Sequence, residues 1–276
     1  MVPLVAGLAV WTLLLMSTAD TIIFRNALGN PRFTDIVRAK GASSVLLVVN
    51  HGIGQGAYGV WLARKTGAGA AVTVGLIGYV MASDLTALFS VAAVSSWLLD
   101  IDTATLVDIE LIRWAAPVCA VTLVSAIFIG PRVLPRFIPS AKILTPWLSV
   151  GSVPYFLSLG LRSMSLFSVM VMTWLGAHIF GLALPLGASL AYLPIIFLAA
   201  TLPINVFGFG AVQLVWVAAF DAWATGEEIL AFQLAFQVLG VSAFLLRGLP
   251  FLPSVLREID EGKMKAHKNN GGRRSS

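Results

Sequence analysis

The chain has 276 residues, of which 58% are hydrophobic and 11% are charged, and its formal net charge is +5. Soluble domains carry roughly 25% charged residues, so this composition excludes an ordinary soluble protein and indicates a polytopic membrane protein. No polar stretch is long enough to fold as a separate catalytic domain. We expect one membrane domain over residues 1–256 and a disordered, basic cytoplasmic tail over residues 257–276 that contacts anionic lipid. We expect no nucleic-acid partner.

The first predicted span covers residues 3–24, because about 20 apolar residues cross the hydrocarbon core of a bilayer. The segment that follows, residues 25–40, is rich in basic residues: Arg25, Arg32, Arg38 and Lys40. Cytoplasmic loops carry an excess of lysine and arginine. We therefore expect this loop in the cytoplasm and the N-terminus outside.

A glycine-rich break interrupts the next apolar segment, residues 42–62. It runs from Val49 to Gly59 with the sequence VNHGIGQGAYG. Lipid cannot satisfy an open backbone, so such a break must be buried in protein or line a wet cavity. Arg64 and Lys65 follow at once, and a full crossing would place them outside. A re-entrant hairpin would keep them in the cytoplasm, and we favour the hairpin.

The middle of the chain continues with two predicted spans. Residues 68–99 run outward to an acidic loop, and residues 114–130 return to a second basic loop that contains Arg132, Arg136 and Lys142. Residues 143–182 have two interpretations. They form either one tilted span with an interfacial lead-in, or two shorter spans that turn near Arg162.

A second break, of sequence LPINVFGFGAVQ, covers residues 202–213 and follows a predicted span over 184–202. If 143–182 holds two spans, this break enters from the outside and mirrors the first one; if it holds one, residues 204–223 must cross. We favour the inverted pair, which is typical of transporters built from repeats. The prediction is an all-α polytopic membrane protein with six to seven transmembrane helices, one or two glycine-broken re-entrant hairpins and an inverted repeat.

Several motifs resemble those of the flippase-like membrane domain of the lysylphosphatidylglycerol synthase family, and this resemblance covers nearly the whole chain. The first motif is a span ending in basic residues, an Asn, a Gly-rich stretch and a basic pair; the second is Pro-Ile-x-x-x-Gly-x-Gly with an acidic residue three positions later. The matching residues are Phe24-Arg25, Asn50, Gly52 to Gly59, Arg64-Lys65, Pro203 to Gly210, and Arg247 in the last span.

The resemblance implies translocation of a lipid, or of a lipid-linked anionic or glycan group, between the leaflets of a prokaryotic cytoplasmic membrane. It implies a phospholipid or polyprenyl-linked lipid as partner, together with a possible enzyme of the same pathway. The chain departs from the family at Gln213, which replaces an acidic residue, and at Gln55-Gly56 or Gly56-Ala57, which replaces the Gly-Glu of the first motif. Of the charges in the following span only Asp84 remains. The soluble synthase domain is missing, so no aminoacyl transfer is implied.

The candidate binding residues at the first break are Asn50, His51, Gly54, Gln55, Gly56 and Tyr58. The polar ones can cap freed backbone groups or contact a head group. The glycines let the backbone approach a ligand and form an anion-binding nest. The segment also matches the dinucleotide pattern G-x-G-x-x-G, but a membrane segment lacks the strand that this pattern requires. Arg64 is either a topological anchor or a phosphate clamp.

Arg162 and Arg247 are predicted to lie within the membrane, where a charge is costly and should face a cavity or a partner. Asp84 and Asp20 are the acids available to them. A pair with Asp84 would be a structural staple or a gate, whereas Arg247 can also snorkel to the interface. Asp20 is one turn from Arg25 and can reach the interface. At the second break the candidates are Asn205, Gly208, Gly210 and Gln213.

Other functions have less support. The chain has no P-loop motif for ATP hydrolysis and no spacing of histidine, cysteine or acidic residues that suits a metal or a catalytic triad. We expect no enzyme activity, no catalytic residue, no metal and no cofactor. The alternatives to lipid translocation are a membrane scaffold or sensor and a small-solute transporter.

Overall fold

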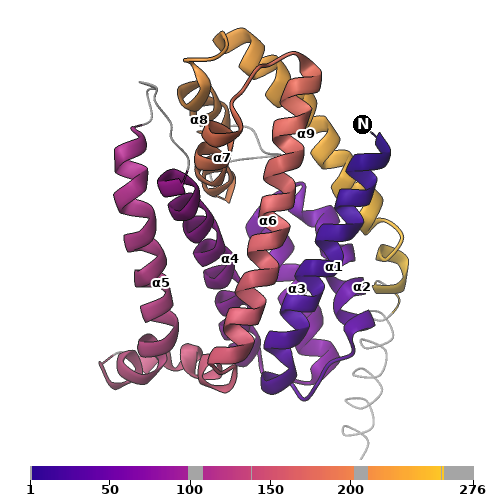
Figure 1. The fold of residues 1–276 in the computed structure, drawn as a ribbon. Helices are drawn as coiled ribbons and strands as arrows, with labels where there is room; N and C mark the ends of the chain where they lie inside the picture. Colours follow the sequence, from indigo (N-terminus) through magenta and orange to yellow (C-terminus); the bar gives the residue numbers. More distant parts are fainter. Residues whose placement is uncertain (1, 99–107, 138, 202–210, 256, 258–276) are drawn as a thin grey trace, which may run out of the picture.

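The computed structural model describes residues 2–98, 108–137, 139–201, 211–255 and 257. Within these residues every regular element is a helix, as predicted (Figure 1). The acidic segment 100–107, most of the second glycine-rich break and the basic tail beyond residue 257 lie outside the described residues. The helices are α1 (Val2–Ala27), α2 (Phe33–Leu47), α3 (His51–Thr66), α4 (Ala70–Leu98), α5 (Ile109–Phe137), the 3-10 helix η1 (Pro139–Ser149), α6 (Ser152–Phe180), α7 (Leu186–Thr201), α8 (Ala211–Phe220) and α9 (Gly226–Gly248).

Five of the described helices, α1, α4, α5, α6 and α9, are long and apolar enough to cross a membrane. The three of 29 residues are about 43 Å long at 1.5 Å per residue, which exceeds the hydrocarbon thickness. The chain is therefore a multi-pass membrane protein. Two further apolar helices, α7 and α8, are shorter, with 16 and 10 residues.

Helices α2 and α3 pack against each other as a hairpin that turns at residues 48–50. Asn50 caps α3: its side chain accepts a hydrogen bond of 2.8 Å from the backbone N–H of Gly52. A cap of this kind satisfies one of the free donors at a helix start. The break in the helix is therefore only three residues long, and the glycines from Gly52 to Gly59 lie inside α3. The expectation of an open glycine-rich stretch is wrong at this point.

The predicted basic loop over residues 25–40 is also too long. Helix α2 already begins at Phe33, with Asp35 in its first turn, where a negative charge is favourable. As a result Lys40 lies in the middle of a helix and is 9% exposed. This position places a lysine inside the bundle rather than in the cytoplasmic loop.

Residues 143–182 contain one long helix rather than two. Arg162 lies inside the continuous helix α6, and the interfacial lead-in is η1. The predicted span over 184–202 is only the 16-residue helix α7, which packs against α8. In Figure 1 both α7 and α8 lie at the end of the bundle where α6 finishes and α9 begins. A single span in 143–182 is thus compatible with a second helical pair that enters and leaves at one end.

The two short helical pairs lie toward opposite ends of the bundle, α2–α3 at the bottom and α7–α8 at the top of Figure 1. Each pair has its own apolar cluster. One cluster packs α7 and α8 against α4, α6 and α9, and the other packs α2 and α3 against α1, α4 and α6. The five long helices therefore hold two separate short pairs, and the candidate site lies between these pairs.

Candidate functional site

A cavity of about 570 Å³ lies between the two short helical pairs. Pockets of 300–1,000 Å³ are typical of small-molecule and cofactor sites. Five residues at the turn of α2–α3 line the cavity, from Leu47 to His51. Ala200 and Thr201, just before the second break, and Val212, within it, also line the cavity. Side chains from α1, α4, α6 and α9 complete the lining, and most of them are apolar.

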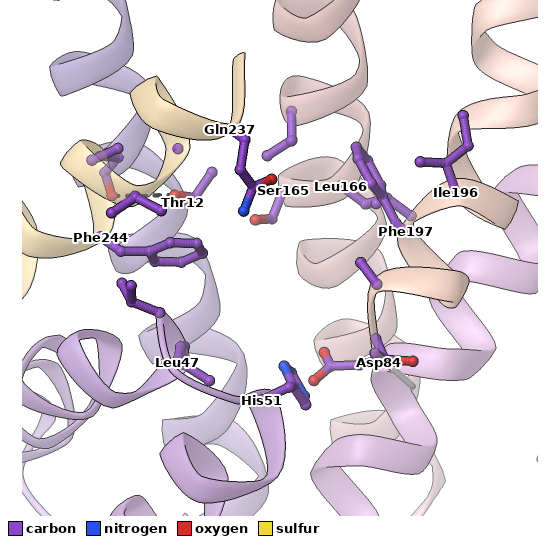
Figure 2. Close-up of a pocket in the computed structure, with 18 of the residues that line it drawn as sticks. Thr12, Leu47, His51, Asp84, Ser165, Leu166, Ile196, Phe197, Gln237 and Phe244 are labelled. Atoms are coloured by element: carbon purple, nitrogen blue, oxygen red, sulfur yellow. Dashed lines mark hydrogen bonds between the residues drawn. The ribbon is translucent and has the colours of Figure 1, made fainter. Parts of the chain in front are cut away.

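A few polar side chains lie within this apolar lining. Figure 2 shows His51 and Asp84 facing one another, with Ser165 and Gln237 pointing into the cavity. Gln233 also lines it, and Gln213 donates a 3.5 Å hydrogen bond to the Gln233 side chain from behind. A mostly apolar cavity with a few fixed polar groups suits an amphipathic ligand.

A buried charge cluster reaches the cavity through Arg162 and Asp84, which line it. Asp20 is fully buried and accepts hydrogen bonds from Lys40 at 2.5 Å, from Arg162 at 2.5 Å and from Tyr58 at 3.0 Å. Arg162 also pairs with Asp84, and its Nε donates to Ser158 at 3.1 Å. Two carboxylates and two cations therefore balance in formal charge. The cluster joins α1, α2, α3, α4 and α6.

This cluster decides between several sequence-based expectations. Arg162 takes Asp84 as a partner, which was one of the pairings left open. Asp20 does not reach the interface, because Lys40 and Arg162 satisfy its carboxylate inside the bundle. Neither Asp20 nor Lys40 was among the predicted site residues. Their signal in the sequence was weak, since each is close to a basic segment that a topology rule assigns to a loop.

Arg247 lies on a different part of the lining. Its Nε donates to Ser44 at 2.9 Å, its Nη1 lies 3.5 Å from Thr12 Oγ1, and its guanidinium stacks 4.5 Å from the ring centroid of Phe244. Within the part of the chain that the structure describes, no carboxylate pairs with it. The side chain lines the cavity, and its hydrogen bonds are to Ser44 on α2 and Thr12 on α1.

The other predicted site residues fall into three groups. Asn50 and His51 line the cavity, whereas Tyr58 lies behind the lining and donates a hydrogen bond to Asp20. Three more lie elsewhere on α3: Gly54 and Gln55 are buried, and Gly56 is exposed. Arg64 is exposed near the far end of α3, about 20 Å along the helix from His51, a position that favours the anchor interpretation. Asn205, Gly208 and Gly210 lie outside the described residues.

Of the glycines in α3, Gly54 allows close packing between α2 and α3, and Gly56 does not. A Cβ at Gly54 would clash with the Leu47 side chain and lie 3.0 Å from the Leu47 backbone nitrogen, whereas a Cβ at Gly56 would meet nothing within 4 Å. Gly54→Ala is therefore expected to lower the stability of the protein by about 1–3 kcal/mol through overpacking. Gly56→Ala should be neutral or stabilising by up to about 1 kcal/mol, because alanine favours a helix.

Thermal unfolding of the two alanine variants in detergent compares these effects directly. Gly56 is the matched control, because it lies two residues away on the same helix. Equal unfolding temperatures for both variants would contradict a packing role for Gly54.

No family model, curated protein or solved structure matches this chain. The residues and their geometry therefore carry the functional argument.

Proposed function

We propose that the protein moves a lipid, or a lipid-linked anionic or glycan group, between the two leaflets of a membrane, or assists a protein that does so. The observation that carries the proposal is the cavity of about 570 Å³, which is apolar over most of its lining and has permanent charges on two sides. An amphipathic molecule matches both parts of this lining. A head group would meet Arg162, Asp84 and Arg247, and its chains would remain in apolar surroundings.

The arrangement of the short helices supports transport. We interpret α2–α3 and α7–α8 as re-entrant hairpins that enter from opposite faces and bring polar groups to mid-depth, as in transporters with inverted repeats. Five crossings put the two termini on opposite sides. With the basic segments in the cytoplasm, the N-terminus is outside and the tail lies on the anionic inner surface.

A second, smaller cavity favours a lipid over a small solute. Its volume is about 180 Å³, and it lies between α6 and α9, with Gly176, Phe180 and Phe232 in its lining. Phe236 and Leu239 line both cavities. The two spaces are therefore neighbours, and the apolar crevice between α6 and α9 offers a route by which hydrocarbon chains remain outside the bundle while a head group is inside.

The proposal agrees with the resemblance to the flippase-like domain of the lysylphosphatidylglycerol synthase family. That resemblance also implies a protein of a prokaryotic cytoplasmic membrane. A scaffold or sensor would not need a charged cavity at mid-depth. A small-solute transporter would need a continuous polar path, whereas most of the described lining is apolar. We therefore place lipid translocation first and a carrier for a small solute second.

The test is lipid translocation in vesicles that contain the purified protein and fluorescent phosphatidylglycerol or phosphatidylcholine. Ala200 lines the cavity, and Ala200→Trp would fill it without removing a charge. Ala115 is exposed on α5 away from the cavity, so Ala115→Trp is the matched control. We expect Ala200→Trp to slow translocation at least about tenfold, which corresponds to about 1.4 kcal/mol, and Ala115→Trp to leave it unchanged.

Two outcomes of this assay would count against the proposal. One is the absence of translocation of either lipid by folded wild-type protein. The other is equal rates for the Ala200→Trp and Ala115→Trp variants, because lipid would then move along a path other than the cavity.

A further inference from the structure

We propose that Arg247 is the head-group site, and that the cavity selects lipids whose head group carries one negative charge, such as a phosphodiester with neutral substituents. The inference rests on the proposed function for the nature of the ligand. It rests on the charges around the cavity for the position of the site and for its preference for an anion.

A count of charges leaves one cation without a counter-ion. The described cavity wall and the cluster behind it contain Asp20 and Asp84, which are balanced by Lys40 and Arg162. Arg247 is the additional cation in the described lining. Its contacts are two hydroxyl groups and an aromatic ring, all of them neutral. The described part of the cavity therefore has a formal charge of +1 and attracts one negative charge.

The energetics of burial support an anionic ligand at this position. A cation removed from water is costly unless a counter-charge and hydrogen bonds compensate it. A guanidinium has five N–H donors in a planar fork, which matches the oxygen atoms of a phosphate. The hydrogen bonds to Ser44 and Thr12 involve Nε and Nη1, so the N–H donors of Nη2 remain available for a ligand. A bound phosphate would provide the missing compensation.

The neighbouring elements add positive potential and polar contacts. The N-terminus of the 16-residue helix α3 lies at the same cavity, with Asn50 and His51 in the lining. The N-terminal end of a helix carries partial positive charge and favours anions. Ser44, which holds Arg247, is only six residues before Asn50 in the α2–α3 hairpin. The guanidinium and the start of α3 are thus positioned by the same hairpin.

The spacing along α9 suits a lipid. Leu239, in the crevice between α6 and α9, precedes Arg247 by eight residues, or about 12 Å along a helix. A phosphate at Arg247 would leave the attached chains within reach of Leu239 and Phe236, where the crevice begins. One helix therefore provides both an anchor for the head group and an apolar path for the chains.

The test compares the binding of dioleoylphosphatidylglycerol, dioleoylphosphatidylcholine and inorganic phosphate to the full chain in detergent, by native mass spectrometry and by the shift in unfolding temperature. Both lipids carry the same phosphodiester, but the choline ammonium of phosphatidylcholine would be repelled by a cavity with a formal charge of +1. Wild type should therefore prefer phosphatidylglycerol about tenfold, or about 1.4 kcal/mol. Arg247→Gln should abolish the preference, and Arg247→Lys should keep part of it. Arg38→Gln removes an exposed arginine from α2, away from the cavity, and should have no effect.

The unfolding temperature without added lipid separates a binding role from a structural one. Because Arg247 has no described counter-ion, Arg247→Gln should unfold at the same temperature as wild type or at a higher one. An unchanged preference in a folded Arg247→Gln variant would overturn the inference, and so would a marked loss of stability in that variant. Equal binding of inorganic phosphate and phosphatidylglycerol would overturn the assignment to a lipid head group.

The binding experiment and the translocation assay test the head-group site and the proposed function separately. If wild type translocates lipid but Arg247→Gln keeps the same head-group preference, the proposed function stands and the site does not. If wild type binds phosphatidylglycerol through Arg247 but moves no lipid, the site stands and the proposed function does not.

Discussion

Replacing Arg162 with alanine is expected to lower the free energy of unfolding by about 3–5 kcal/mol, the largest effect among the variants considered. The guanidinium is 2% exposed and binds Asp20, Asp84 and Ser158. Its loss would leave Asp84 without its partner and Asp20 with only Lys40 and Tyr58. A buried carboxylate without compensation is much more costly than a lost surface contact.

The measurement is thermal or denaturant unfolding of the purified protein in one detergent, with Lys65→Ala as the control. Lys65 pairs with Asp35 at 3.6 Å, and its side chain is 36% exposed, so this pair contributes only about 0–1 kcal/mol. Equal stability of the Arg162→Ala variant and wild type would contradict a structural role for the buried cluster.

Gly248→Ala is expected to be the next most damaging change, with a loss of about 1–3 kcal/mol from overpacking. Helix α9 crosses α2 at this point so closely that a Cβ at Gly248 would lie 2.7 Å from the carbonyl oxygen of Gly41 and 2.7 Å from Val45 Cγ2. A backbone atom cannot move away as a flexible side chain can. The two helices would have to separate, and the contact between Arg247 and Ser44 would change with them.

Gly240→Ala is the matched control for this prediction, since it makes the same change on the same helix. A Cβ there would meet nothing within 4 Å, so the variant should gain up to about 1 kcal/mol from helix propensity. The two unfolding temperatures should therefore move in opposite directions. A stabilised Gly248→Ala variant would mean that α2 and α9 do not pack closely at Gly248.

The class of the protein and the approximate positions of the five long helices could be predicted from the sequence, because an apolar run of membrane length forms a transmembrane helix in most proteins. The pairing of Arg162 with Asp84 could be proposed from the sequence for a related reason. Charges in such runs are costly and need partners, and few were available.

The short helices were harder to interpret, because hydropathy alone does not distinguish a span from one arm of a hairpin. Helix α7 is among the most apolar segments of the chain, yet it has only 16 residues and returns through α8. The glycines around Gly54 were interpreted as a break that lets the backbone approach a ligand. The structure places them inside α3, and the approach of Leu47 shows that Gly54 allows close packing between α2 and α3.

The charge cluster could not be assembled from local sequence patterns. Asp20 and Lys40 are 20 residues apart, and Asp20 and Arg162 are 142 apart, so their contacts depend on the packing of whole helices. The positive-inside rule assigned Lys40 to a loop because of its basic neighbours. The rule describes average loops and does not detect a single lysine that turns into the bundle.

We propose that lipid head groups enter the cavity between α2–α3 and α7–α8. Photocrosslinking in vesicles tests this with phosphatidylglycerol that carries a diazirine on its head group, followed by mass-spectrometric mapping of the modified residues. We expect adducts on cavity residues such as His51, Met81 and Gln237. Adducts restricted to exposed residues of α5, such as Trp114 and Val118, with none in the cavity, would contradict it.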